Sequence, residues 1–137
     1  MMKNPLIYLA TPYTFYRHGI DDAWRDACEL ASYLMIAGHS VYSPIVHSHP
    51  ISEVSSLDPM DGKLWERFNA PMLAAADILV VAHLDDWDRS AGIAHEISVF
   101  EAAGKPIVHL TFPISTILSD LDKTIAAWAV TKQENTP

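Results

Sequence analysis

The chain has few of the features that mark secreted, membrane or cysteine-ligated metal proteins. Its 137 residues include one cysteine, Cys28, so neither an internal disulfide nor a paired-cysteine metal site can form. No apolar run approaches the roughly 20 residues that a membrane-spanning helix needs, and the first residues show no secretory signal pattern. We therefore expect a cytoplasmic protein in which Cys28 is a small apolar residue on a helix.

Basic residues are also scarce. Nine Lys and Arg stand against seventeen Asp and Glu, which gives a formal net charge of −8. A surface of this sign repels phosphate backbones, so a nucleic acid is not an expected partner. A small anionic ligand remains an open class, because local dipoles at one site can outweigh the overall charge.

Hydrophobic patterning predicts strands and helices in alternation. Apolar runs rich in strand formers cover residues 6–10, 39–43, 78–82 and 106–110. Helical spacing predicts helices from Asp21 or Asp22 to Gly38, from Asp61 with a kink or break at Pro71, from Ser90 to Gly104, and from Ser115 to Lys132. This order predicts one domain over residues 1–132 and a frayed tail over 133–137. The fold class is α/β, with a doubly wound flavodoxin- or Rossmann-like parallel sheet of roughly four to five strands and helices on both faces.

The segment from Pro44 to Pro59 has no clear period and predicts a long loop, a feature often used for function. His47 and His49 could lie on one side of that loop. No carboxylate or cysteine is spaced to complete a metal site with them, so neither a metal nor another cofactor is expected. His47 is instead a candidate contact for a base or a phosphate.

In a doubly wound sheet, ligands bind beyond the carboxyl ends of the strands, at the point where the strand order reverses. The richest segment at that edge includes Ser90 and Gly92, which offer a helix cap, a close-approach glycine and free N–H groups for an anion. Glu96 falls near the helix face of Gly92 and could stand behind such a pocket. Alternatively, Ser90 is an ordinary helix cap and Glu96 is a solvated residue, as we expect of Glu101 on the same helix.

Two side chains near this segment are assigned by helix geometry to packing. His95 points about 100° away from Glu96 around the helix, so we expect it to contact core residues or another subunit. Trp65 is expected in an inward stripe. The stripe consists of Leu64, Trp65, Phe68, Met72 and Leu73.

Four segments, in order and spanning most of the chain, carry a family resemblance. They are Ile7-Tyr8-Leu9-Ala10-Thr11-Pro12-Tyr13, Ala76-Asp77-Ile78-Leu79-Val80-Val81, Ser90-x-Gly92-x-x-x-Glu96 and Gly104-Lys105-Pro106-Ile107. Together they resemble the nucleoside 2-deoxyribosyltransferases and the related deoxynucleoside 5′-monophosphate N-glycosidases. The stretch from Trp87 to Glu96 indicates an uncharacterised branch of that superfamily.

The resemblance implies that Glu96 attacks the anomeric carbon of a sugar and that Tyr8 orients the carboxylate. It also implies a phosphate contact for Ser90 and a homo-oligomer, either a dimer or a tetramer. Trp87 is read either as a base-stacking or lid residue or as simple loop packing. The residues expected to bind substrate are Ala10, Thr11, Pro12, Tyr13, His47, Asn69, Asp86, Trp87, Ser90 and Gly92.

Two positions depart from the family pattern. Asn69 stands where relatives commonly have an aspartate that serves the leaving base, and an amide cannot deliver a proton. Ala94 replaces a glycine and could narrow the sugar pocket. The expected function is hydrolysis or transfer of an N-glycosidic bond of a nucleoside or nucleoside 5′-monophosphate. The alternatives are a non-catalytic nucleotide-binding or sensing module and, on weaker grounds, a structural partner protein.

Overall fold

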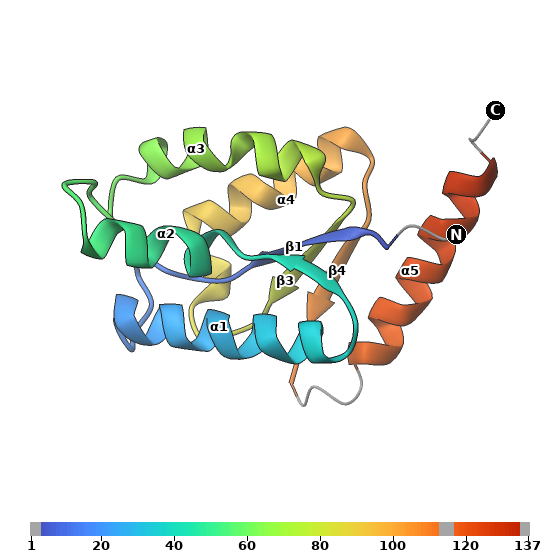
Figure 1. Cartoon of the computed structure of the whole chain (residues 1–137), viewed down its shortest axis with the longest axis horizontal. Helices are drawn as coiled ribbons and strands as arrows, with labels where there is room; N and C mark the ends of the chain where they lie inside the picture. The colour runs from blue at the N-terminus through green and yellow to red at the C-terminus, as the bar shows by residue number, and fades with distance from the viewer. Residues whose placement is uncertain (1–3, 113–116, 135–137) are drawn as a thin grey trace.

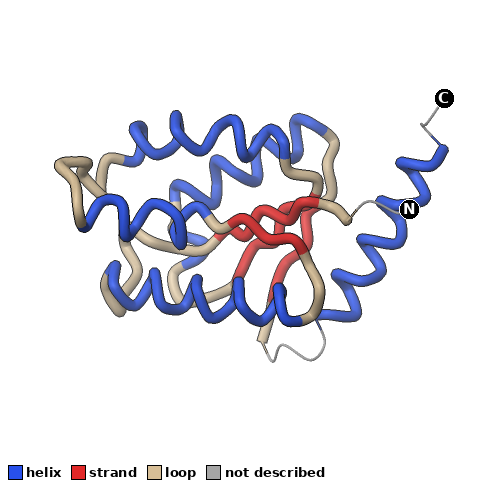
Figure 2. Tube along the Cα trace, in the orientation of Figure 1, coloured by secondary structure: helices blue, strands red, loops and turns tan. Residues whose placement is uncertain are grey.

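The protein is built around one parallel sheet. The computed structural model describes residues 4–112 and 117–134, and in this part of the chain four strands pair in the order β2-β1-β3-β4. Figure 2 shows them side by side at the centre of the molecule. All three pairings are parallel, which confirms the predicted fold class. The strands are β1 (Leu6–Ala10), β2 (Ser40–Tyr42), β3 (Ile78–Ala82) and β4 (Ile107–Leu110).

Helices cover both faces of the sheet, with α3 and α4 on one side and α1 on the other (Figure 1). The chain passes from β1 to β2 on one side of β1 and then crosses to β3 on the other side. The strand order therefore reverses between β1 and β3, where a doubly wound sheet binds its ligands. The helices are α1 (Ile20–Ile36), α2 (Pro44–Glu53), α3 (Gly62–Ala75), α4 (Ala91–Ala103) and α5 (Ile117–Glu134).

Alternate side chains of β1 pack in two separate hydrophobic clusters, because successive residues of a strand point to opposite faces of the sheet. Ile7 and Leu9 pack with α1 and α5 through residues such as Leu34 and Leu121. Tyr8 packs on the other face, in a cluster that includes Phe100 of α4. All five residues of β3 are buried, as its continuous apolar run predicts. Tyr8 therefore lies on the face of the sheet that α4 covers.

Local sequence signals fix the ends of the helices around the site. The Ser90 Oγ accepts a hydrogen bond from the backbone N–H of Ile93 at 3.2 Å and begins α4. Gly104 ends α4 in the left-handed conformation, with φ of 66°. Asp61 caps α3 in the same way as Ser90 caps α4, through the N–H of Leu64. These boundaries agree with the predicted ones.

The predicted long loop after β2 is wrong, because Pro44–Glu53 forms helix α2. The Ser43 side chain caps this helix, and Pro44 occupies its first turn, where a missing N–H costs nothing. Pro50 lies inside the helix, where proline is disfavoured. The amino-acid composition of this segment therefore resembles that of a loop. His47 and His49 accordingly lie on a helix and not on an extended segment.

Several boundaries and one packing stripe also differ from prediction. Helix α1 begins after Gly19, so Asp21 and Asp22 lie in its first turn and do not cap it. Helix α3 continues through Pro71 without a break. Helix α5 extends to Glu134, two residues past its predicted end, and its predicted start at Ser115 lies outside the described residues.

The expected inward stripe of α3 is only partly buried, because Phe68 and Met72 are exposed and Leu64 and Trp65 are half-buried. Leu73 is the one fully buried side chain of this helix. Phe68 is 50% exposed and Met72 is 36% exposed. Helical spacing alone could not identify the buried face, because the inner side of α3 borders a cavity as well as the core. Among the described residues, no helix is both long and apolar enough to cross a membrane.

Candidate functional site

A cavity of about 380 Å³ opens at the carboxyl edge of the sheet, where the strand order reverses. Its floor comes from β1 and α4, and its walls come from the loop after β1, from α2, from α3 and from the loop before α4. Cavities of this size hold a drug-sized molecule. Nine predicted site residues line it: Tyr8, Thr11, Pro12, Tyr13, Asn69, Asp86, Ser90, Gly92 and Glu96.

The floor of the cavity holds a buried carboxylate. Glu96 lies on the inner face of α4 and is 9% exposed, in contrast to Glu101, which is exposed on the same helix. The Tyr8 hydroxyl hydrogen-bonds to the Glu96 carboxylate. Burial raises the pKa of Glu96 to about 8, and the bond from Tyr8 opposes part of that rise. The pair places an ionisable oxygen on the buried floor of the cavity.

Tyr8 is held in place by its own surroundings. It is 1% exposed and packs its ring 5.6 Å from that of Tyr42, measured between ring centroids. Burial raises the pKa of the Tyr8 phenol, and the nearby Glu96 carboxylate raises it further. The phenol therefore stays protonated over the ordinary pH range and can serve Glu96 as a hydrogen-bond donor.

The start of α4 forms the side of the cavity next to Glu96. Ser90 both caps the helix and borders the cavity, so the two predicted roles do not exclude each other. A Cβ atom at Gly92 would meet the Ser90 Oγ at 3.7 Å, which is an ordinary van der Waals contact. The protein itself therefore does not demand a glycine here, and Gly92 leaves open space that faces the cavity.

Asp86 joins the two loops that border the cavity. Its carboxylate binds Arg17 through two side-chain contacts, at 3.0 and 3.1 Å, and accepts a third bond from the Arg17 backbone N–H at 3.0 Å. The hydrogen bond from the Arg17 guanidinium holds the pKa of Asp86 below its ordinary value. Asp86 also adopts a left-handed backbone conformation, with φ of 65°. Its oxygens are thus engaged with Arg17, which fixes the loop before α4 against the loop after β1.

Asn69 reaches the cavity from α3 with its amide oriented by a neighbour. The Tyr42 hydroxyl donates a hydrogen bond to the Asn69 Oδ1 at 3.1 Å. In that orientation the NH₂ group remains available as a donor toward a ligand. Asn69 can therefore bind an acceptor atom of a ligand, but it cannot act as an acid.

Three predicted site residues do not line the cavity. Ala10 is fully buried in the core under it. His47 is exposed on α2, and its ring lies 6.0 Å from that of Tyr42. Trp87 stacks on His83 at 3.8 Å, which favours the loop-packing alternative for this tryptophan. Ala94 is exposed and is also absent from the lining, so it does not narrow the cavity in this structure.

The structure adds lining residues that the sequence assigned elsewhere. His95, expected to pack or to meet another subunit, is half-buried, borders the cavity and lies 3.6 Å from Glu66. Trp65 lines the cavity from α3 and donates its indole N–H to the Asp58 carbonyl oxygen at 2.8 Å. Phe15 forms part of the rim and is 73% exposed. A helix that borders a cavity has one side toward the core and another toward the cavity. The spacing of its apolar residues alone does not distinguish these two sides.

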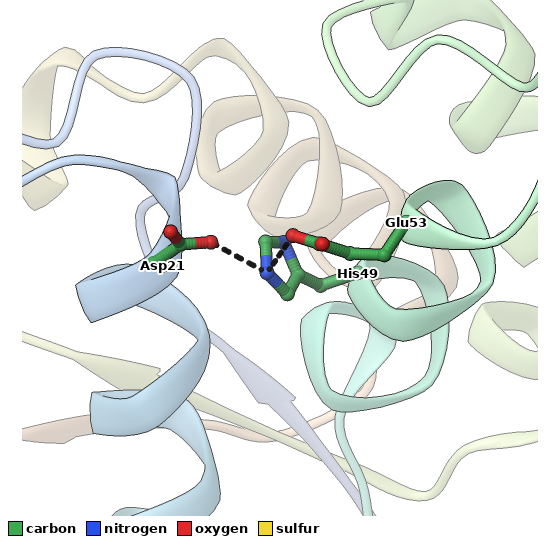
Figure 3. A group of neighbouring side chains, drawn as sticks. All are labelled: Asp21, His49 and Glu53. Atoms are coloured by element: carbon green, nitrogen blue, oxygen red, sulfur yellow. Dashed lines mark hydrogen bonds and ion pairs between the residues drawn. The ribbon is translucent and has the colours of Figure 1, made fainter.

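A buried histidine lies directly behind the cavity wall. The Tyr13 hydroxyl is 2.7 Å from His49 Nδ1, and His49 is 3% exposed. The other ring nitrogen, Nε2, lies 3.1 Å from Asp21 and 3.2 Å from Glu53 (Figure 3). Both carboxylates are more than half exposed, whereas the imidazole between them is buried.

The prediction that no carboxylate is spaced to complete a site with these histidines is wrong. Glu53 follows His49 by one helical turn, a spacing that brings the two side chains together only because this segment is a helix. Asp21 comes from the first turn of α1 and is brought in by tertiary packing alone.

A family match covers most of this structure. The model of a domain of unknown function, DUF1937, matches residues 5–111, from the start of β1 to the end of β4. The chain belongs to this family. No curated protein matches it. The DUF1937 match includes every element that builds the cavity, and its description assigns no activity.

Proposed function

We propose that this DUF1937 protein cleaves the N-glycosidic bond of a nucleoside or nucleoside 5′-monophosphate through Glu96. The observation that carries the proposal is a buried carboxylate at the floor of a ligand-sized cavity, hydrogen-bonded by Tyr8. A retaining glycosidase needs such a carboxylate to trap the oxocarbenium-like centre of the sugar as a covalent intermediate. The resemblance of four sequence segments to the nucleoside 2-deoxyribosyltransferases supports the same chemistry.

Each partner in the proposed reaction has a separate task. Glu96 forms a bond to the sugar C1′ as the bond from C1′ to the base nitrogen breaks. Tyr8 donates to the Glu96 carboxylate and holds the attacking oxygen in place. Ser90 and Gly92, at the positively polarised start of α4, would receive the sugar or its 5′-phosphate. Water then releases the sugar, or a second base accepts it.

A second candidate is a non-catalytic nucleotide-binding module that uses the same cavity. The observation that favours it is Asn69, an amide at the position where the resemblance leads one to expect a carboxylic acid. An amide donor can recognise a base without promoting its departure. This candidate predicts binding of an intact nucleotide without release of free base.

The experiment is a chromatographic search for free base after incubation with ribo- and deoxyribonucleosides and their 5′-monophosphates. Glu96→Gln should abolish release because an amide cannot attack C1′, whereas Glu101→Gln on the exposed side of α4 should leave it unchanged. Release by the Glu96→Gln variant at the wild-type rate would overturn the nucleophile assignment. Thermal stabilisation by a nucleotide with no release from any substrate would favour the binding module.

A further inference from the structure

The proposed reaction needs a proton for the leaving base, and Asn69 cannot supply it. Five other titratable side chains besides Tyr8 and Glu96 line the cavity with Tyr13: Tyr16, Lys63, Glu66, Asp86 and His95. The Asp86 carboxylate is held by Arg17, and the Tyr16 hydroxyl donates to Asp26 at 2.6 Å. Glu66 and His95 pair with each other at the solvent-facing wall. Tyr13 differs from all of these because its hydroxyl contacts a buried imidazole.

The surroundings of His49 determine which way that contact runs. Two carboxylates converge on Nε2, one from α1 and one from α2. In an imidazolium both ring nitrogens carry a proton, and the Nε2–H would point at these carboxylates. Nδ1 then donates to the Tyr13 oxygen, 2.7 Å away. The tyrosine keeps its own O–H proton for an acceptor in the cavity.

We propose that Tyr13 is the general acid of this site and that His49, charged between Asp21 and Glu53, supplies its proton. The inference rests on the proposed N-glycosidic function. Tyr13 would be a catalytic residue, whereas His49 acts through it and is a positioning residue. The ring of Trp24 stacks on His49 at 5.5 Å and holds the imidazole plane in place.

Protons balance over the two steps, which are formation and hydrolysis of the glycosyl-Glu96 intermediate. As the bond from C1′ to the base breaks, its electron pair stays on the base nitrogen, which takes the Tyr13 hydroxyl proton. The Tyr13 oxygen takes the Nδ1 proton, and His49 becomes neutral. When water attacks C1′ of the glycosyl-Glu96 ester, the C1′–O bond to Glu96 breaks and the carboxylate is restored. The proton lost by water passes to Tyr13 as the tyrosine returns its own proton to Nδ1.

Two further features fit this role. Burial raises the pKa of Tyr13, while a hydrogen bond with Ser52 opposes the rise. A phenol with a raised pKa stays protonated at ordinary pH but is a weaker acid, so Tyr13 would act as an acid only as His49 replaces its proton. The groups that face His49 are Tyr13, Asp21, Glu53 and the ring of Trp24, and the two carboxylates are the acidic groups among them.

The test compares two leaving groups on the same sugar. One substrate is the nucleoside or monophosphate that wild type cleaves fastest, and the other is the 4-nitrophenyl glycoside of that sugar, whose phenolate leaves without a proton. Tyr13→Phe should lower kcat on the first by about 10²–10⁴-fold and leave cleavage of the second within a few-fold of wild type. The retained cleavage also shows that the variant is folded. Tyr33→Phe, on the exposed side of α1, is the control and should match wild type on both.

Other outcomes distinguish failure of the general-acid role from failure of the proposed N-glycosidic function. Equal effects of Tyr13→Phe on both substrates, or none on either, would overturn the acid role while leaving the N-glycosidic function standing. A leaving-group-dependent loss in His95→Gln in place of Tyr13→Phe would assign the acid to His95. Asp21→Asn with Glu53→Gln should reproduce part of the Tyr13 defect and alter the pH profile, which a merely structural His49 would not do. No cleavage of either substrate by wild type would overturn the function, and the acid with it.

Discussion

Replacing Glu96 with glutamine should stabilise the protein, and the gain should grow with pH. In the folded state the carboxyl has a pKa of about 8, against an ordinary value of 4.5, because burial disfavours its charged form. The folded protein therefore binds this proton more tightly than the unfolded chain does. The contribution of the Glu96 carboxyl to the free energy of unfolding is fully present below pH 4.5 and is lost as pH rises toward 8. Glutamine has a similar shape and carries no charge at any pH.

The expected magnitude follows from the two pKa values of Glu96. Ionisation of this group costs the fold under about 1 kcal/mol at pH 5, about 3 kcal/mol at pH 7 and about 4 kcal/mol at pH 8. The free energy of unfolding of Glu96→Gln should exceed that of wild type by these amounts. Few single substitutions stabilise a protein this much. Such gains arise at functional sites, where a buried group has a charged form that the fold disfavours.

Urea unfolding of both proteins at several pH values measures the difference directly. Glu101→Gln is the matched control, since that carboxylate is exposed on the same helix and should give no pH-dependent gain. Groups other than Glu96 titrate alike in the compared proteins and cancel. A difference between wild type and Glu96→Gln that stays constant from pH 5 to pH 8 would refute the argument that a buried carboxylate with a raised pKa lies in the cavity.

Three further predictions concern activity and packing. Because the nucleophile must be ionised, kcat/KM for the 4-nitrophenyl glycoside, whose leaving group needs no proton, should rise as pH increases through about 8, where half of Glu96 is ionised, and a rate that falls over that range would contradict this role. Phe100→Ala should lower the free energy of unfolding by about 3–5 kcal/mol, because this ring is fully buried between α4 and the sheet, and chemical unfolding measures the loss. Gly104→Ala should cost about 1 kcal/mol or more, since φ of 66° at the end of α4 disfavours a side chain; unchanged stability would mean that this helix end is not held as described.

The sequence was most informative where one local signal decides the structure. The apolar run of β3, the Ser90 cap and the Gly104 end of α4 are all set by neighbouring residues, and all are found as predicted. The position of Glu96 on the inner side of α4 also follows from helical spacing. Because parallel strands end at one edge, the sequence alone predicts that the residues after β1 and before α4 lie together.

What the sequence did not reveal depends on competing signals or on tertiary packing. Helix α2 was missed because Pro44 and Pro50 resemble loop punctuation, although the first position of a helix accepts proline. The contact of His49 with Asp21 joins segments 28 residues apart, and no periodicity predicts such a pair. The ion pair of Asp86 with Arg17 is of the same kind, since the partners are 69 residues apart in the sequence.

The exposed helix α3 has a consequence for how binding would be detected. Leu73 is the one fully buried side chain among its 14 residues, yet the helix carries Asn69 and Trp65 into the cavity wall. Local unfolding of such a helix costs little, so its amide hydrogens should exchange with solvent faster than those of α4. A molecule in the cavity would supply the packing partner that α3 lacks. Slowed amide exchange along α3 would then report occupancy whether or not a bond is broken.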